Sequence, residues 1–491
     1  MSSSTVESVF AEQGLKPRLG QAEASKALAK ALKDGLSTVF VAPTGWGKTL
    51  AVLAALKVSG RLPALWLIRS LEVGGRVEED AMLLGLRCFR AAGRVRTCPY
   101  AERFEDAVHD YCRFFRASCS YYINLLRQGV KLPATSWEDL LGGDFCPYYA
   151  QDVAVGEADI IVQSYYRRLY RASAVIVDEA HNLLAPRERR LSLKAVAEAV
   201  SELRALGFFE LAEELWHACT GAGAIRLERL NVADYSAALR EALARLSRVK
   251  GLPKVVRALR SCSAGGAAYR EEGADKIMIY DAPWRPPFKP VVYVSATIPE
   301  RLEVLLSASA SVRVPAEPRE ALVTSWLTSK YGEETVWGYV KLLSKLRFRC
   351  RRVLAFASER LAVRLLDAVQ YYEETPPPDW RGVLLLHVRG RYAEGVDLPA
   401  DCVAVLGAPF LPPEVTARLR RYYARIGAGD AALWAPMVIT TLQAVGRAAR
   451  RPGDRPLIIL GDCRFAKYSD YFRPYLDLRE VGEEELSRVL A

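Results

Sequence analysis

A glycine-rich turn near the start of the chain has the residue types that hold phosphate. It reads APTGWGKT over residues 42–49, follows the apolar run 38–41 and leads into a helical pattern. A strand, a turn and a helix in this order aim several backbone N–H groups at one point, with the positive end of the helix dipole behind them. Lys48 would then reach the β- and γ-phosphates of a nucleotide, and Thr49 would offer its hydroxyl to Mg²⁺. The usual pattern begins with glycine where this chain has Ala42, so a plain turn before a surface helix is the alternative.

Two adjacent carboxylates, Asp178 and Glu179, follow a second apolar run at 174–177. An Asp at the carboxyl end of a buried strand is placed to hold Mg²⁺ through its water shell. The next carboxylate can orient and deprotonate an attacking water. An ordinary helix-capping pair is the alternative. Lys48 and Asp178 are 130 residues apart, far more than one βαβ unit needs, which predicts an insertion between them.

Arg447 and Arg450 lie three residues apart in the second half of the chain. On a helix both side chains project from one face, and facing a γ-phosphate they would act as arginine fingers. An arginine-rich helix is usually a solvated surface, and only its pairing with the motifs above favours catalysis. Gln21, one helix upstream of the phosphate loop, has an amide that could read an adenine edge, although a polar residue at a helix start explains it equally well.

Four cysteines lie within one segment that is rich in arginine and aromatic residues. Cys98, Cys112, Cys119 and Cys146 have 13, 6 and 26 residues between them. Four thiolates suit a tetrahedral zinc site or an iron–sulfur cluster, and their spacing does not choose between the two. No CxxC pair is present, so buried unconnected cysteines or disulfides remain alternatives. Cys88, between apolar neighbours, is expected in the core.

Length and composition indicate a globular, multidomain protein of 491 residues with 51% hydrophobic and 25% charged residues. Its net charge of +11 favours a polyanionic partner, although solubility alone would also explain it. Seven Gln and three Asn, beside abundant Arg and Glu, are typical of a thermophilic source. No apolar stretch of about 18 residues and no signal-peptide core occurs, so we expect a soluble, cytoplasmic protein without a membrane partner.

Two α/β patterns separated by helices organise the rest of the chain. Apolar strands of the first pattern are expected at 38–41, 65–68, 160–162, 174–177 and 291–294, and helices over 187–268. After about residue 308 a second α/β pattern has strands at 353–356, 384–386, 403–406 and 457–460. It has no phosphate loop. The fold class is therefore α/β with two parallel sheets.

In this order the motifs resemble those of the XPD (Rad3-like) family of superfamily 2 iron–sulfur DNA helicases, archaeal type. The matching segments are RLGQ at 18–21, 42–49, Arg69-Ser70, DEAH at 178–181, SAT at 295–297, GRYAEGVD at 390–397 and QAVGRAAR at 443–450. GRVRTC at 93–98 and CPYY at 146–149 resemble the borders of the family's four-cysteine [4Fe–4S] domain. The likeness spans almost the whole chain. It departs in the six-residue gap between Cys112 and Cys119 and in a short interval of 33 residues between Phe356 and Gly390.

The resemblance implies two RecA-like lobes, with an iron–sulfur domain and a helical Arch domain inserted in the first. Lobe 1 would comprise 1–86, 151–186 and 286–307, the cluster domain 87–150, the Arch 187–285 and lobe 2 308–491. Binding and hydrolysis of ATP·Mg²⁺ would fall to Gln21, Gly45, Gly47, Lys48, Thr49, Asp178, Glu179, Gly395, Asp397, Gln443, Arg447 and Arg450. Cys98, Cys112, Cys119 and Cys146 would hold the [4Fe–4S] cluster.

The resemblance also implies 5′→3′ translocation on single-stranded DNA, unwinding of forked duplex and a role in nucleotide excision repair, by a nucleoid-associated monomer that meets other repair proteins. Grip on the strand would be electrostatic and assisted by stacking. Candidate contacts are Arg69, Arg94, Arg96, Tyr165 and Tyr166, each equally compatible with a core or surface role. Two rival functions are a DNA-stimulated translocase that remodels protein–DNA complexes without unwinding, and an ATP-gated damage-recognition scaffold.

Overall fold

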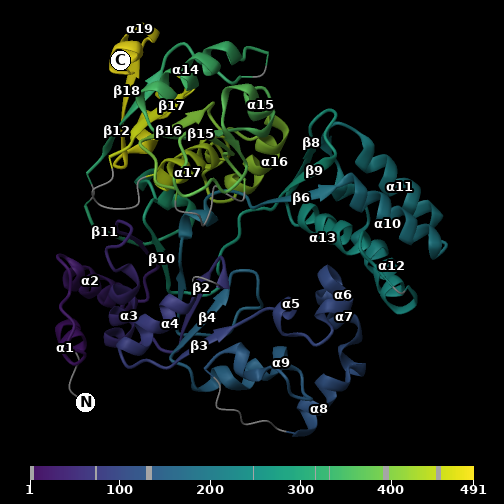
Figure 1. Ribbon diagram of the computed structural model, residues 1–491. Coiled ribbons are helices and arrows are strands. Elements are labelled where there is room, and N and C mark those ends of the chain that lie inside the picture. Colours follow the sequence, from purple (N-terminus) through teal and green to yellow (C-terminus); the bar gives the residue numbers. More distant parts are fainter. Residues whose placement is uncertain are drawn as a thin grey trace.

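Two parallel α/β lobes form the body of the protein, and two insertions extend from the first lobe (Figure 1). The N-terminal helix belongs to lobe 1, and the C-terminal helix to lobe 2. The computed structural model describes residues 5–71, 74–128, 135–246, 248–315, 317–330, 332–390, 398–448 and 455–490. No described helix is both long and apolar enough to span a membrane.

Lobe 1 is built on a seven-stranded sheet of order β11-β1-β10-β5-β2-β4-β3, in which every pairing is parallel. The strands are β1 (Thr38–Val41), β2 (Ala64–Ile68), β3 (Cys88–Ala91), β4 (Ile160–Ser164), β5 (Ala174–Val177), β10 (Val291–Ser295) and β11 (Ala310–Arg313). One face packs under four helices, α1 (Val6–Ala11), α2 (Gln21–Lys33), α3 (Lys48–Ser59) and α4 (Gly74–Leu83). The other face meets the cysteine-rich insertion and lobe 2. Because both faces are covered, the central strands are continuous apolar runs, as expected from the sequence.

The register of this sheet brings three strand ends to one edge. Val41 of β1 pairs with Ser295 of β10, and Tyr293 of β10 pairs with Val177 of β5. Residues that follow β1, β5 and β10 therefore share the carboxyl edge, where ligands bind in parallel sheets.

Lobe 2 repeats this architecture with the strand order β14-β15-β13-β16-β17-β12-β18, again all parallel. Its strands are β12 (Arg319–Thr324), β13 (Arg352–Ala357), β14 (Tyr371–Tyr372), β15 (Gly382–His387), β16 (Cys402–Leu406), β17 (Leu457–Gly461) and β18 (Leu476–Val481). Its helices are α14 (Val336–Arg349), α15 (Glu359–Val363), α16 (Pro413–Ala424), α17 (Ala431–Ala448), α18 (Ser469–Phe472) and α19 (Glu483–Leu490). The predicted α/β fold with two parallel sheets is confirmed.

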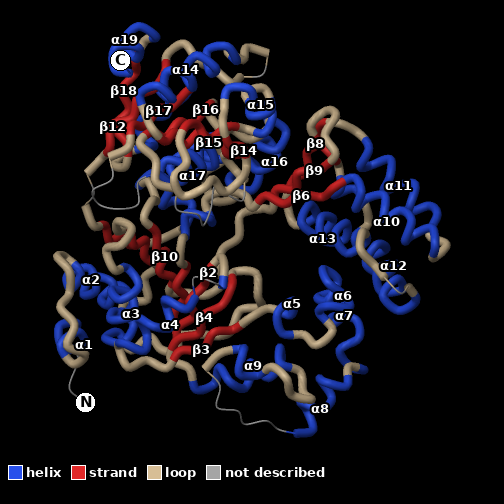
Figure 2. Tube along the Cα trace, viewed as in Figure 1, coloured by secondary structure: helices blue, strands red, loops and turns tan. Residues whose placement is uncertain are grey.

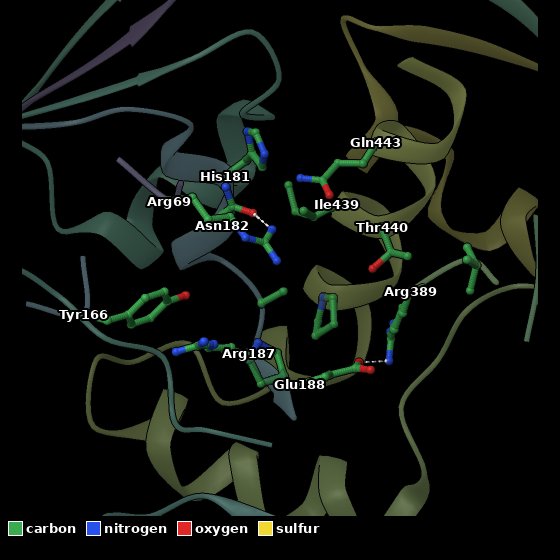
Figure 3. A pocket seen from close by; sticks show the side chains of 14 residues that line it. Arg69, Tyr166, His181, Asn182, Arg187, Glu188, Arg389, Ile439, Thr440 and Gln443 are labelled. Atoms are coloured by element: carbon green, nitrogen blue, oxygen red, sulfur yellow. Dashed lines mark hydrogen bonds and ion pairs between the residues drawn. The ribbon is translucent and has the colours of Figure 1, made fainter. Parts of the chain in front are cut away.

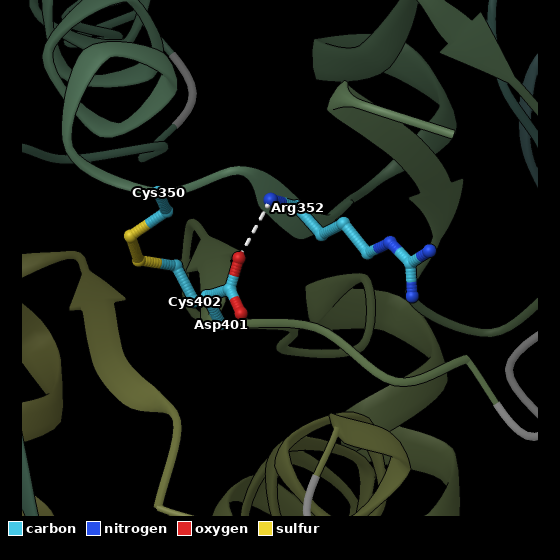
Figure 4. The surroundings of a disulfide bond; sticks show 4 residues. All are labelled: Cys350, Arg352, Asp401 and Cys402. Atoms are coloured by element: carbon cyan, nitrogen blue, oxygen red, sulfur yellow. Dashed lines mark hydrogen bonds between the residues drawn. A yellow bond between two sulfur atoms is a disulfide. The ribbon is translucent and has the colours of Figure 1, made fainter. Parts of the chain in front are cut away.

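A disulfide joins two segments of lobe 2 that are 52 residues apart in sequence. Cys350, which ends α14, bonds to Cys402 at the start of β16, with their Cα atoms 6.2 Å apart (Figure 4). Beside it, the Arg352 backbone N–H donates to the Asp401 carboxylate at 2.9 Å. Both contacts tie the start of β13 to the start of β16, its neighbour in the sheet.

The cysteine-rich insertion, here called the cysteine domain, consists of short helices between β3 and β4. They are α5 (Arg94–Thr97), α6 (Ala101–Phe104), α7 (Val108–Phe115), α8 (Ser120–Gln128) and α9 (Pro147–Ala154). The sequence analysis placed the border of this domain at residue 87, but β3 belongs to the lobe 1 sheet, where it pairs with β4. Cys88 of β3 is buried as expected, and burial raises its pKa to about 12.

The second insertion, residues 187–285, is called the helical insertion. Its helices are α10 (Leu193–Ala205), α11 (Phe209–Thr220), α12 (Val232–Arg245) and α13 (Leu252–Ser263). They stand beside an antiparallel sheet of order β6-β9-β8-β7, formed by β6 (Glu188–Ser192), β7 (Gly223–Ile225), β8 (Ala267–Arg270) and β9 (Lys276–Tyr280) (Figure 2). The helices were predicted and the sheet was not, because strands of three to five residues leave too short a pattern.

The border between the lobes also differs from the prediction. Residues from 308 onward were assigned to lobe 2, but β11 pairs with β1 and forms an edge of the lobe 1 sheet. Three of its residues are partly buried and Ser311 is exposed, so no apolar run marks the strand in the sequence.

Candidate nucleotide site and inter-lobe pocket

The predicted phosphate loop connects β1 to α3, as the sequence indicated. Gly45 and Gly47 have φ angles of 78° and 98°, in the region that side chains disfavour. A Cβ on Gly47 would lie only 2.6 Å from Nε2 of Gln21. Lys48 begins α3, and Thr49 is the second residue of that helix. The turn therefore depends on its two glycines, and the helix N-terminus points to the site.

Lys48 lies inside the loop that it belongs to. Its Nζ donates to the carbonyl oxygens of Ala42 at 3.0 Å and Pro43 at 3.1 Å. Burial lowers the pKa of this ammonium group, and the charges of Asp178 and Glu179 partly oppose the shift. The loop lysine and the two carboxylates thus act on one another electrostatically, although 130 residues separate them in sequence.

Asp178 follows β5 at the same edge of the sheet. Its two carboxylate oxygens accept from Trp66 Nε1 at 3.4 Å and from the Glu179 backbone N–H at 2.9 Å. Burial raises the pKa of Asp178, with Glu179 adding to the shift and Lys48 opposing it. Glu179 has φ of 49°, unusual for a side-chain-bearing residue, and its side chain is 64% exposed. The backbone thus turns Glu179 outward while Asp178 stays in the protein.

Ser295 connects the strand end of β10 to the DEAH segment. Its Oγ lies 2.8 Å from Nδ1 of His181 and also accepts from the Thr297 backbone N–H at 3.1 Å. The matched motifs at 178–181 and 295–297 are therefore in direct contact. Burial lowers the pKa of His181 to about 4, so the ring is neutral at neutral pH. The charge of Arg447, from lobe 2, contributes to that lowering.

Gln21 is buried and both ends of its amide are used within the protein. Its Oε1 accepts from the Arg18 backbone N–H at 2.8 Å, and its Nε2 donates to the Gly47 carbonyl at 3.0 Å. These bonds fasten the segment before α2 to the phosphate loop. The sequence analysis had considered the amide only as a reader of adenine or as a polar residue at the start of a helix.

Lobe 2 contributes α17, which contains Gln443 and Arg447. Gln443 lines a pocket between the lobes together with His181 (Figure 3). The predicted residues Gly395, Asp397 and Arg450 lie outside the described residues. Of the predicted lobe 2 set, the structure therefore places Gln443 and Arg447.

The inter-lobe pocket joins lobe 1, the base of the helical insertion and lobe 2. Its lining combines Arg69, Tyr166, His181, Asn182, Ala185, Pro186, Arg187, Glu188, Val388, Arg389, Pro436, Ile439, Thr440 and Gln443. Arg69 donates to Oδ1 of Asn182 at 2.8 Å, and Arg389 to Glu188 at 2.9 Å (Figure 3). The Arg187 guanidinium lies 3.6 Å from the centre of the Tyr166 ring. Cations and an aromatic face thus converge on one pocket, a combination that binds single strands.

The five predicted DNA contacts have different surroundings. Arg69 and the half-exposed Tyr166 line the pocket, and Arg96 is exposed on the cysteine domain. Tyr165 is buried and donates its hydroxyl to the Asp178 carbonyl, so its ring is not placed to stack on a base. Arg94 lies 3.9 Å from the centre of the Tyr148 ring and donates to the Tyr149 hydroxyl at 3.0 Å. The sequence analysis missed Arg187 and Arg389. Arg187 lies close to the DEAH segment and Arg389 directly precedes the 390–397 motif, and these positions were the available signals.

The four predicted cysteine ligands line a single cavity in the cysteine domain. Cys98, Cys112, Cys119 and Cys146 share it with Arg116 and several aromatic rings. Burial raises the pKa of Cys98, and that of Cys146 to about 11. Within the described part of the chain, no three His, Cys, Asp or Glu side chains are grouped closely enough to hold a metal ion. The donor set itself, four thiols around one cavity, fits a cluster bound by four cysteines.

Comparisons with known proteins find likeness in both sequence and fold. A family model described as "Helicase C-terminal domain" matches residues 364–477. The ATP-dependent DNA helicase XPD of Sulfolobus acidocaldarius is 25% identical over 186 residues, which cover 34% of this chain and 33% of that protein. The match therefore spans about a third of the length of this curated relative.

Solved structures show the same fold over nearly the whole chain. A structure titled "XPD_Helicase" has a TM-score of 0.67 at 20% identity and covers 95% of this chain and 100% of its own. One titled "XPD_APO" has a TM-score of 0.61 at 18% identity, covering 94% and 100%. A third, of Xpd4 from S. tokodaii, has a TM-score of 0.60 at 16% identity, covering 94% and 100%.

Proposed function

We propose that the chain, which is similar to an XPD helicase in sequence over about a third of its length and to XPD structures in fold over nearly all of it, is an XPD-like (Rad3-like) helicase that hydrolyses ATP to translocate 5′→3′ on single-stranded DNA and to unwind duplex. The supporting observation is geometric: the phosphate loop after β1 and Asp178 after β5 share one carboxyl edge of the lobe 1 sheet, and α17 of lobe 2, which contains Arg447, lines a pocket with His181. The groups that would bind phosphate, hold Mg²⁺ and activate water thus come from lobe 1, and the cationic groups that would face the γ-phosphate come from lobe 2.

In this proposal the triphosphate occupies the loop that Lys48 now fills. Lys48 would exchange its two carbonyl partners for phosphate oxygens, and the N–H groups at the start of α3 would face the same oxygens. Thr49 and Asp178 would hold Mg²⁺, which neutralises phosphate charge when bound. Glu179 would orient and deprotonate the attacking water, and Arg447 with Arg450 would stabilise charge on the γ-phosphate. Gln21 would hold the phosphate loop in place through its bonds to Arg18 and Gly47, with Gly395, Asp397 and Gln443 completing the site.

The contact between His181 and Ser295 would connect hydrolysis with the strand. His181 lies in the DEAH segment beside Glu179 and also lines the inter-lobe pocket. A change in the position of Glu179 or Arg447 on hydrolysis would therefore act on a group that faces the pocket. We propose that this pocket holds the single strand, with Tyr166 and Arg187 stacking on a base and Arg69 near a phosphate.

For the cysteine domain we propose a [4Fe–4S] cluster held by Cys98, Cys112, Cys119 and Cys146. The cluster would act as a structural staple, since helices of four to nine residues supply little apolar core of their own. Brown protein with absorbance near 400 nm and four irons per chain supports the cluster. Colourless protein with stoichiometric zinc would refute the cluster and indicate a zinc site.

The physiological setting is proposed on the same basis. An XPD-like enzyme of this kind would act on single-stranded and forked DNA in nucleotide excision repair, as a nucleoid-associated monomer that meets other repair proteins. A translocase that remodels protein–DNA complexes without unwinding is the second candidate, because the interval between β13 and the 390–397 motif is short.

The deciding experiment is ATP-dependent unwinding of two duplexes, one with a 5′ single-stranded tail and one with a 3′ tail. Separation of the 5′-tailed duplex alone supports the proposed enzyme. Stimulation of ATP hydrolysis by single strands with neither duplex separated supports the translocase. Lys48→Ala is the blank, because it removes the proposed phosphate contact, and the hydrogen bonds that it breaks within the protein go to the backbone carbonyls of Ala42 and Pro43.

A further inference from the structure

Helix α7 of the cysteine domain lies between the cysteine cavity and the helical insertion. It contains Cys112, one of the four proposed ligands. Tyr111 and Phe115, on the same helix, line the cavity beside Cys112 and also pack against the apolar core of the helical insertion. Two aromatic rings therefore serve both as a wall of the cavity and as a contact with the insertion, and any shift of α7 moves them together with Cys112.

Further apolar residues of the cysteine domain enter the same core. Ala107, which directly precedes α7, is 1% exposed and belongs to the apolar cluster of the helical insertion, and Phe104 and Phe114 pack against that cluster. The rings of Phe104 and Tyr111 stack with their centres 3.8 Å apart. Apolar burial of this kind is the main source of stability in a domain contact. The cysteine domain, whose own helices are short, therefore obtains part of its apolar core from the helical insertion.

One guanidinium of the helical insertion fixes the orientation of α7. Arg260 of α13 donates at 2.7 Å to Oδ1 of Asp110, two residues before Cys112, and at 3.3 Å to the hydroxyl of Ser236 on α12. The side chain of Asp110 is 7% exposed and that of Arg260 31%. A charged hydrogen bond to a buried carboxylate is strong, and loss of the arginine would leave an unpaired charge inside the protein. Arg260 therefore ties α7 to two helices of the insertion.

The turn before α7 is held by two more cations of α13. Arg257 donates at 3.0 Å to the backbone carbonyl of Asp106. Nitrogen atoms of Arg257 and Lys254 also lie 4.0 Å and 3.7 Å from the Asp106 carboxylate. Residues three apart are neighbours on a helix surface, so Lys254, Arg257 and Arg260 follow one another along α13. They face the segment 106–110, which leads directly to Cys112.

From these contacts we infer that Arg260 of the helical insertion is a positioning residue for the four-cysteine cavity. By holding Asp110, and with it α7, Arg260 keeps Cys112 at the cavity beside the other three cysteines. The two partners are 150 residues apart in sequence, so a different domain controls how firmly the cysteine domain retains its bound group. The inference deepens the proposed function and rests on it only for the identity of that group as an iron–sulfur cluster.

Metal retention by the full-length protein, purified without oxygen, tests the inference. Arg260→Gln removes the partner of Asp110 but keeps most of the side-chain volume. Because the unpaired carboxylate destabilises the position of α7, iron should pass to a chelator about tenfold faster or more. Cys219, buried in the core of the helical insertion, should stay protected from a thiol reagent. Iron release at the native rate overturns the inference, and so does equally fast exposure of Cys219, which would assign Arg260 a merely structural role.

Matched variants separate Arg260 from the rest of this contact. Arg248→Gln is the control, because Arg248 pairs with Glu105 across the same contact but in side chains 64% and 60% exposed, where ion pairs contribute little. It should release iron at the native rate. Arg260→Lys keeps the charge without the planar fork and should be intermediate. If Arg260→Gln does not fold, Arg260→Lys is compared with Arg248→Lys by the same measurement.

A double variant tests whether Arg260 acts through Asp110. When Asp110→Asn is added to Arg260→Gln, no unpaired carboxylate remains, so iron should be released more slowly than from Arg260→Gln alone. Release from the double variant that is as fast as from Arg260→Gln, or faster, means that Arg260 does not act through Asp110 and overturns the inference.

Two further readouts separate the inference from the proposed cluster. If the purified protein contains zinc, the cluster is refuted, and zinc release is measured in the same variants with the same expectation. If it contains no metal, the rate at which Cys112 reacts with a maleimide replaces metal release. That rate should rise about tenfold or more in Arg260→Gln and stay native in Arg248→Gln. An unchanged rate at Cys112, or an equal rise at Cys219, overturns the role of Arg260 whatever the cysteines bind.

Discussion

Replacement of Gln21 by alanine tests whether this residue positions the phosphate loop or reads the adenine base. The buried amide makes two hydrogen bonds, from the Arg18 N–H and to the Gly47 carbonyl. At about 0.5–1.5 kcal/mol for each neutral bond, their loss should lower the free energy of unfolding by about 1–3 kcal/mol. Because Gly47 belongs to the loop that binds phosphate, and phosphate is common to all nucleotides, the KM values for ATP and GTP should rise by the same factor.

The assay pairs urea unfolding with steady-state hydrolysis of ATP and of GTP, both with saturating single-stranded DNA. Gln13→Ala is the matched control, since Gln13 is exposed on the same lobe. If the stability of Gln21→Ala is unchanged and the preference for ATP over GTP disappears, the positioning role is refuted and base recognition is supported. A loss of stability with a proportional rise of both KM values supports positioning.

Three further results are expected. Glu179→Gln should lower kcat for ATP hydrolysis by about 10²–10⁴-fold with little change in KM, because it removes the proposed base but leaves the backbone N–H that binds Asp178; an unchanged kcat would exclude Glu179 as the base. The pKa of His181 is about 4 in the folded protein and 6.5 in the unfolded chain, so between these pH values the unfolded state binds one more proton. The contribution of His181 to the free energy of unfolding is therefore fully present above pH 6.5 and falls by about 3 kcal/mol as the pH drops to 4. Urea unfolding at pH 7 and pH 4.5 should show a smaller loss of stability in His181→Gln than in the native protein. An identical loss in the variant and the native protein would assign the loss to other groups. Cys350→Ala should lower stability by up to about 4 kcal/mol, because the disulfide closes a loop of 52 residues, and thiol titration of the denatured native protein should gain two thiols on reduction; no gain would mean that the bond does not form.

The parts of the site that are local in sequence could be predicted well. The phosphate loop is one strand, one turn and one helix. The roles of Gly45, Gly47 and Lys48 follow from the eight residues of this turn alone. The motifs that contain His181 and Ser295 lie at the carboxyl ends of two predicted strands, and the parallel sheet brings these ends to one edge.

Other assignments failed where the signal was short or the environment was remote. The short strands β3 and β11 were placed in the wrong domain, since four residues at a sheet edge carry no distinctive pattern. Tyr165 and Tyr166 are neighbours with the same side chain, yet one is buried and the other lines the pocket. Their difference depends on which way the chain turns after β4, which no adjacent residue reveals.

The sequence by itself determined the two α/β lobes, the phosphate loop and the carboxylate pair, because these follow from apolar runs and glycine turns that act over a few residues. Only the tertiary structure decided which groups meet across the chain. It bound Gln21 to the phosphate loop and gathered four cysteines around one cavity. Such contacts depend on how whole helices and strands pack. The identity of a single residue therefore does not indicate which side chain will be its partner in the folded protein.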